Sequence, residues 1–209
     1  MNIDTLLPFV SATFILALMP GPDNLYVLVE SLNKGRRNGV AVSLGLASGV
    51  MIHTLAAALG LSVIIGESEA VYFLFKILGA AYLFYLAWKA WNEKGIESAG
   101  SSYMETKRDP FFIMVRRGFI MNVLNPKVSL FFIAFLPQFV DTAAGGIILQ
   151  MITLGSIFMI VTIFIFCSIA LISGRIGNLL KSKKFWNGTR ITKTLILLIL
   201  AIGLLISGK

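Results

Sequence analysis

The stretch LALMPGPDNLYVL, residues 16–28, places two prolines, a glycine, an acid and an amide inside a strongly apolar run. Proline removes a backbone hydrogen bond and clashes with the preceding turn, so Pro20 and Pro22 predict a break in a helix. The apolar run extends over about residues 5–33, which puts this break at its midpoint. A second run, about residues 111–140, carries NPK at 125–127, again at its midpoint. The sequence therefore predicts two helices that are interrupted half-way along.

The composition indicates an integral membrane protein. Of the 209 residues, 57% are hydrophobic and 13% are charged, with a mean hydropathy of +0.86, whereas soluble domains carry about a quarter charged residues. Apolar runs of span length recur along the chain and predict an all-α fold with six transmembrane helices. The expected spans are about residues 5–33, 39–65, 70–91, 111–140, 146–173 and 190–207.

The basic residues predict the orientation. Of the 18 basic residues, 15 lie in or beside three alternate connections: Lys34, Arg36 and Arg37; Lys89, Lys94, Lys107, Arg108, Arg116 and Arg117; Arg175, Lys181, Lys183, Lys184, Arg190 and Lys193. The N-terminal segment and the other two connections carry acids instead, namely Asp4, Glu67, Glu69 and Asp141. The positive-inside rule therefore places the basic connections in the cytoplasm and both termini outside. Because this distribution explains the net charge of +8, the charge does not indicate nucleic-acid binding.

The two broken spans are the first helices of two halves within a single transmembrane domain, residues 1–209. Residues 1–91 form the first three-helix half, 92–110 a polar cytoplasmic linker, and 111–209 the second half. Because each half has an odd number of spans, the halves must have opposite topology. The sequence thus predicts an inverted repeat in which discontinuous helices meet at a midplane binding site.

Two helix starts are expected to face that site. The second half-helix of the first span begins near Asp23, and that of the fourth span begins at Pro126, with Asn125 placed to cap it. Proline suits the first helical position. Helix N-termini offer unpaired N–H groups and a partial positive charge, which favour a carboxylate.

Asp23 and Lys127 are the ionisable pair expected near the membrane centre, where such residues are costly and often functional. Asn24, Asn122 and Asn125 add amides that both donate and accept hydrogen bonds. A zwitterion could therefore place its ammonium on Asp23 and its carboxylate on the turn that carries Lys127. In the alternative interpretation, Asp23 and Lys127 pair with each other and only hold the halves together.

Three other residues or motifs have competing interpretations. His53, in the second span, is either a hydrogen-bonded packing residue or a participant in proton movement. Gly45 and Gly49 form a GxxxG pattern that predicts close helix packing. Cys167 has no partner for a disulfide and is expected to be a small packing residue.

Several motifs are absent from the sequence. It has no GxxxxGK[ST] loop for an ATP-driven motor, no HExxH or Cys/His cluster for a catalytic metal, and no serine-centred elbow with a partner histidine. The chain is therefore expected to be neither an enzyme nor the carrier of a cofactor or metal.

The residues resemble the LysE/RhtB family of bacterial amino-acid exporters. The resemblance rests on MPGPDNLYVL, SLNKGRRNGVAVSLGLASGVMIHTLAAALGL, FKILGAAYLFYLAW and GFIMNVLNPKVSLFFIAFLPQF, in this order. It implies proton-driven efflux of amino acids across the bacterial cytoplasmic (inner) membrane. Carried over by position, the first signature comprises Pro20, Gly21, Pro22 and Asp23, and the second comprises Asn122, Asn125, Pro126 and Lys127.

The chain departs from the resemblance at one place that bears on substrate charge. Many members carry an acid a few positions before the histidine of the second span, where this chain has Val50 and Met51. A neutral substrate of the threonine, homoserine or leucine class is therefore expected. The expected partners are the amino acid, protons and the lipid bilayer, and the sequence is compatible with a homo-oligomer.

Other functions compete with amino-acid export. A small cation or metal-ion exporter could use the same broken helices, although it would favour several acids in the core. A membrane scaffold would move no solute, and an intramembrane enzyme based on Asp23 and His53 would lack a nucleophile.

Overall fold

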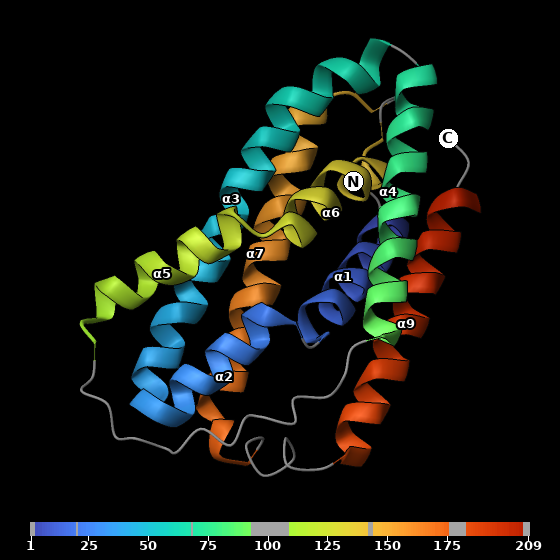
Figure 1. Ribbon diagram of the computed structural model, residues 1–209. Coiled ribbons are helices and arrows are strands. Elements are labelled where there is room, and N and C mark those ends of the chain that lie inside the picture. The colour runs from blue at the N-terminus through green and yellow to red at the C-terminus, as the bar shows by residue number, and fades with distance from the viewer. Residues whose placement is uncertain are drawn as a thin grey trace.

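The computed structural model of the chain describes residues 3–19, 21–67, 69–92, 109–141, 144–175 and 183–206. Within these ranges every regular element is a helix (Figure 1). The elements are α1 (Ile3–Leu18), α2 (Pro22–Lys34), α3 (Arg36–Glu67), α4 (Glu69–Trp91), α5 (Phe111–Val123), α6 (Pro126–Ala134), the 3₁₀ helix η1 (Leu136–Phe139), α7 (Ile147–Leu171) and α9 (Lys183–Ile206).

Both predicted helix breaks are confirmed. The helix α1 ends at Leu18 and α2 begins at Pro22, while α5 ends at Val123 and α6 begins at Pro126. The axes of the two members of each pair are bent by 54°. In both pairs a proline occupies the start of the second helix, where its missing N–H costs nothing. Pro20 lies outside the described residues.

The predicted spans correspond to helices, although not all of them meet the requirements for a membrane span. Among the described residues, α3 over Arg36–Gly60 and α7 over Ile147–Leu171 are long and apolar enough to cross a membrane. Two bent pairs are also long and apolar enough if each pair is counted as one span. The first pair is α1 with α2, and the second is α5 with α6 and the η1 turn that follows it. This gives up to four candidate spans in the described part of the chain, so the count of six stays a prediction.

The long helix α3 is the centre of the fold, and it packs closely on both α5 and α7. At its crossing with α5, Gly45 faces the backbone of Val115 and Phe119, while Gly118 faces the backbone of Val42. No side chain would fit between these backbones without displacing one of the helices. The close packing predicted from the GxxxG pattern is therefore confirmed at Gly45.

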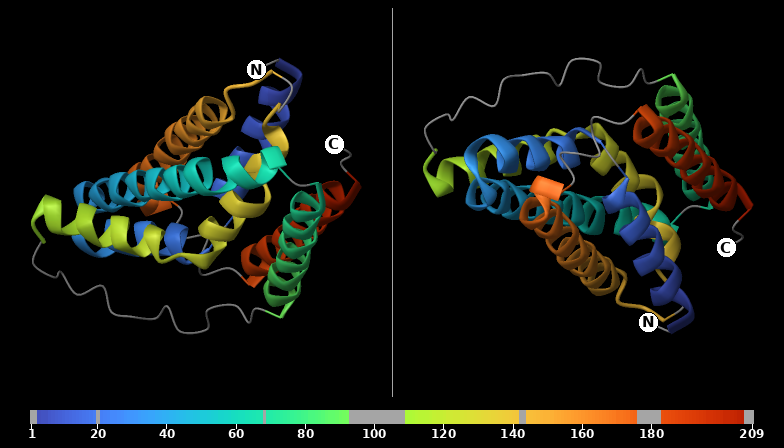
Figure 2. Two further views of the ribbon diagram at one scale, coloured as in Figure 1. Left: turned by 90° about the horizontal axis from the view of Figure 1, so that it is seen from above. Right: turned by 90° about the horizontal axis from the view of Figure 1, so that it is seen from below.

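The buried side chains form three clusters. The first joins α1, α3, α6 and α7 around residues such as Phe9, Phe132 and Met151. The second joins α2, α3, α5 and α7. The third holds α4 against α9 through small side chains such as Ala80 and Ala201. Figure 2 shows this α4 and α9 pair beside the remaining helices, with α6 facing it.

One lysine of α4 and one lysine of α9 are buried. Lys76 of α4 is only 9% exposed. Lys193 was counted with a connection, but it lies inside α9 and is 7% exposed. The helix α9 begins at Lys183, earlier than the expected span, and so includes the polar residues before 190.

Candidate functional site

The starts of α2 and α6 lie beside each other at the two helix breaks. The N-cap of α2 is Gly21, which provides no side chain, whereas the N-cap of α6 is Asn125. The Asn125 side-chain oxygen accepts a hydrogen bond of 3.0 Å from the backbone N–H of Lys127. This local geometry is the capping that the NPK sequence predicts.

A hydrogen bond joins the two helix starts directly. The Asn125 side-chain amide donates to Asp23 Oδ2 at 2.8 Å, across 102 residues of sequence. Asn125 is 8% exposed, and Asp23 is half-buried. The single Asn125 side chain therefore caps α6 with its oxygen and holds the α2 carboxylate with its nitrogen.

Lys127 lies on the other side of the same junction. A Cβ atom built on Gly21 would lie 3.7 Å from Lys127 Nζ, so the ammonium is next to the α2 start. The charges of Lys127 and Asp23 interact, but no ion pair within 4.0 Å joins them in the described part of the chain. The two charges are thus held near each other by the helix starts and by Asn125.

Lys127 also borders a narrow cleft between α1, α4 and α6. The rest of the lining is almost entirely apolar and consists of Leu16, Gly79, Tyr82, Leu83, Leu86, Phe131 and Phe135. The buried Lys193 of α9 is close enough for its charge to act on Lys127. The sequence interpretation missed Lys193 because it sits near the predicted end of a basic connection, and the packing of α9 on α4 makes it internal.

Asn24 and Asn122 have different environments in the structure. The Asn24 amide donates to the Ala17 carbonyl at 2.8 Å, which satisfies one of the unpaired carbonyls at the end of α1. Asn122 is 2% exposed, and its side-chain oxygen has no hydrogen-bond partner in the described residues. Gly49 makes room for Asn122, since a Cβ at Gly49 would lie 2.7 Å from Asn122 Cβ.

His53 contacts the second break from α3. Its Nε2 atom lies 3.0 Å from the Asn122 carbonyl oxygen. A carbonyl can only accept, so this contact places the proton on Nε2. The hydrogen bond gives His53 a structural role at the end of α5, and a role in proton movement stays a prediction.

The predicted site residues are therefore mostly brought together. Gly21, Pro22, Asp23, Asn125, Pro126 and Lys127 lie at the junction of the α2 and α6 starts. Asn24 supports α1, while Asn122 and His53 surround the end of α5. What these positions do during transport stays a prediction.

The capping role of Asn125 makes a stability prediction. Replacing Asn125 with alanine removes the side-chain cap of α6, and loss of an N-cap costs about 1 kcal/mol. Asn125→Ser keeps a capping oxygen, so it is expected to unfold nearer the wild-type temperature than the alanine variant. Its side chain is too short to reach Asp23. Thermal unfolding in detergent compares the three proteins. Equal unfolding temperatures for the alanine and serine variants would contradict the capping role.

Comparison with known proteins identifies the family of this chain. Residues 14–208 match the family model described as LysE type translocator. The chain belongs to the LysE family. This match includes both helix breaks and the whole junction described above.

Individual LysE relatives cover most of the chain. The uncharacterized membrane protein YrhP of Bacillus subtilis is 30% identical over 187 residues, which span 87% of this chain and 89% of that protein. The leucine efflux protein of Salmonella choleraesuis is 32% identical, over 79% of this chain and 76% of its own length. The leucine efflux protein of Enterobacter sp. (strain 638) is 26% identical, over 84% and 82%. No solved structure matches the chain. LysE family members are membrane transporters and not enzymes.

Proposed function

We propose that this LysE family member exports neutral amino acids from the bacterial cytoplasm in exchange for protons. The observation that carries the proposal is the hydrogen bond from Asn125 to Asp23 at the meeting point of two helix starts. This contact puts an acid, a base and the N–H groups of two interrupted helices within one small region. Such a region suits a ligand that carries one ammonium and one carboxylate.

Each end of an amino acid has a complementary group at the junction. The substrate ammonium would bind Asp23, replacing the amide of Asn125 or sharing the carboxylate with it. The substrate carboxylate would bind Lys127 and the N–H groups at the start of α6. Asp23 would take up a proton after the ammonium leaves, which couples export to proton entry.

The charges near Lys127 favour a neutral side chain. Among the described residues, the charges that act on Lys127 are those of Asp23 and of the buried Lys193. This chain has Val50 and Met51 where the family resemblance implies a second acid in many members. A basic side chain would add a further positive charge to this region. The apolar lining of the cleft beside Lys127 is compatible with an aliphatic side chain. The relatives named leucine efflux proteins support the same substrate class.

The equal bends of the two helix pairs support alternating access. We infer that residues 1–91 and 111–209 are inverted halves, because each contributes one helix pair bent by 54° at its break. Rocking of one half against the other would expose the junction to each side in turn. The end of the molecule that carries Lys34 and Arg117 would face the cytoplasm, with both termini outside.

A counterflow assay on purified protein tests this function. Proteoliposomes with an imposed pH gradient are expected to accumulate labelled leucine or threonine, at least about tenfold faster than labelled lysine, and a protonophore should stop the accumulation. Liposomes without protein are the control. Labelled divalent cations in parallel vesicles test the cation-exporter alternative. Cation flux without amino-acid flux, or no flux of any solute, would overturn the proposal.

A further inference from the structure

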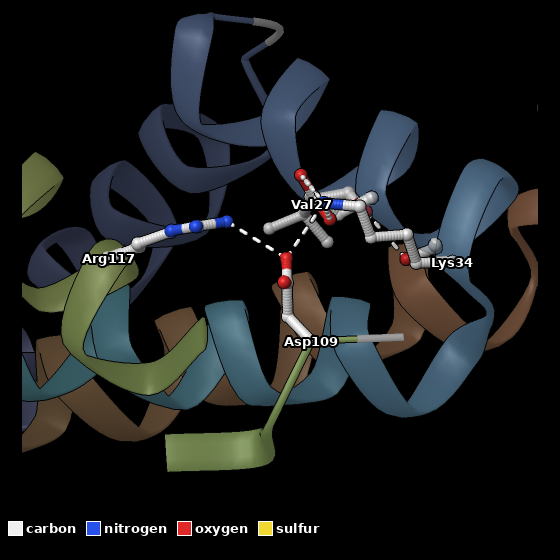
Figure 3. A network of polar contacts seen from close by, with 6 residues as sticks. Val27, Lys34, Asp109 and Arg117 are labelled. Carbon is white, nitrogen blue, oxygen red and sulfur yellow. Dashed lines mark hydrogen bonds and ion pairs between the residues drawn. The ribbon is translucent and has the colours of Figure 1, made fainter. Parts of the chain in front are cut away.

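Four charged side chains join α2 to the beginning of α5 at the end of the molecule that carries Lys34 (Figure 3). Lys34 Nζ lies 2.9 Å from Asp109 Oδ2 and 3.2 Å from Glu30 Oε2. Arg117 Nη1 lies 3.0 Å from the same Asp109 oxygen. Asp109 Oδ2 therefore accepts from one cation on α2 and from one on α5. These four residues are called the latch below.

The latch connects the two halves of the chain. Glu30 and Lys34 belong to the first broken helix pair, whereas Arg117 belongs to the second and Asp109 lies two residues before its start. Both α2 and α5 pack on α3. Arg117 also interacts with the side chain of Tyr26, which adds a second contact from α5 to α2. The ion pairs thus tie together two helices that α3 supports separately.

The position of the latch relative to Asp23 suggests what it closes. Lys34 is 11 residues beyond Asp23 on α2, which corresponds to about 16 Å along a helix that rises 1.5 Å per residue. Arg117 is on the half-helix that leads to the break at Asn125. A solute that moves between α2 and α5 toward Asp23 would have to pass the latch first.

We propose that Glu30, Lys34, Asp109 and Arg117 form a gate that closes the passage between α2 and α5 to the Asp23 junction. The inference rests on the proposed transport function, because a gate needs a solute path. Partly exposed ion pairs contribute little to stability, so they can break and re-form in each transport cycle. The arrangement in the structure is the closed state of this gate.

Asp109 is expected to stay charged near neutral pH. The hydrogen bond from Lys34, together with the charge of Arg117, lowers the pKa of Asp109 below its usual 3.8. Because the folded-state pKa is lowered, the contribution of Asp109 is present above this value and is lost only as the pH falls below it. Around Asp109 the facing charges are Lys34 and Glu30 from α2 and Arg117 from α5.

A cysteine reporter tests the gate without relying on transport. Cys167, the single cysteine of the chain, is replaced by serine, and Met121→Cys places a thiol one turn beyond Arg117 on α5. Met121 is half-buried and packs in the cluster that includes Val27 of α2. A membrane-impermeant maleimide is added to vesicles of each orientation, and the rate of labelling is measured.

Asp109→Asn is expected to raise the labelling rate from one side of the membrane about tenfold, because it removes the negative charge that pairs with both Lys34 and Arg117. Asp109→Glu retains a carboxylate and should label at the parental rate. Arg116→Gln, at the exposed neighbour of Arg117, is the matched control. Lys34→Gln opens the same contact from α2, so the test does not depend on the folding of one variant.

Three outcomes separate the gate from the proposed function. Faster labelling of Asp109→Asn or Lys34→Gln, unchanged between about pH 5.5 and 7.5, supports the gate. Equal labelling of these variants, Asp109→Glu and Arg116→Gln would overturn it, even if amino acids are transported. Faster labelling in a protein that moves no amino acid would show that the latch holds α2 and α5 together and would reject the export function.

Discussion

Asp23→Asn is expected to abolish pH-driven amino-acid counterflow and to leave the protein folded. Asparagine has the shape of aspartate, and its side-chain oxygen can still accept the hydrogen bond that Asn125 donates at 2.8 Å. It cannot take up a proton or balance an ammonium group. Hydrogen bonds to charged groups contribute about 1.5–3 kcal/mol, so loss of ammonium binding alone predicts a decrease of about 10- to 150-fold. Loss of the exchangeable proton removes the remaining coupling.

The control for this experiment is Asp141→Asn. Asp141 is exposed, and its side-chain oxygen accepts from the N–H of Ala144 at 3.2 Å, a role that asparagine can keep. Counterflow and unfolding temperature should both match the wild type. If Asp23→Asn transports at the wild-type rate, Asp23 is not the coupling residue. If it fails to insert or unfolds early, the charge is structural, as the alternative pairing with Lys127 requires.

The second large effect is expected at the crossing of α3 and α5. A Cβ atom on Gly45 would meet the backbone of Val115 and Phe119, and one on Gly118 would meet the backbone of Val42. Backbone atoms cannot rotate away as a side chain can, so the helices must separate. Overpacking costs about 1–3 kcal/mol and sometimes more, and Gly45→Ala or Gly118→Ala is expected at the upper end. Thermal unfolding in detergent and the monodisperse fraction measure the loss.

Gly60→Ala is the matched control on the same helix, because nothing lies within 4 Å of a Cβ at that position. It should be neutral, or stabilising by up to about 1 kcal/mol through helix propensity. The Gly45→Ala, Gly118→Ala double variant should lose less stability than the sum of the single losses, since both separate the same two helices. Equal stability of Gly45→Ala and Gly60→Ala would show that the crossing can widen freely.

The sequence predicted the features that depend on local chemistry. Pro22 and Pro126 cannot occupy a helix interior without breaking it, and Asn125 is a favoured N-cap, so the breaks and the cap of α6 follow from a few adjacent residues. The glycine pattern at Gly45 likewise indicated a close helix contact. The family resemblance, drawn from the PGPD and NPK motifs, agrees with the LysE family match.

The sequence was less informative where a residue's role depends on distant neighbours. The hydrogen bond by which Asn24 satisfies the carbonyl of Ala17 was not predicted from the sequence. Asp109 and Arg117 were counted only as linker or loop charges, whereas they form the latch with Lys34. Lys193 was assigned to a connection, but packing of α9 against α4 buries it.

The amino-acid order by itself determined that this chain is helical and apolar and that two helices are broken half-way, because proline, glycine and hydrophobic periodicity act through the nearest residues. Only the tertiary structure decided that Asn125 bonds Asp23 across 102 residues and that Asp109 lies between Lys34 and Arg117. Pairings of this kind are set by the way α3 positions α2 and α5 in space. No spacing along the chain encodes that placement.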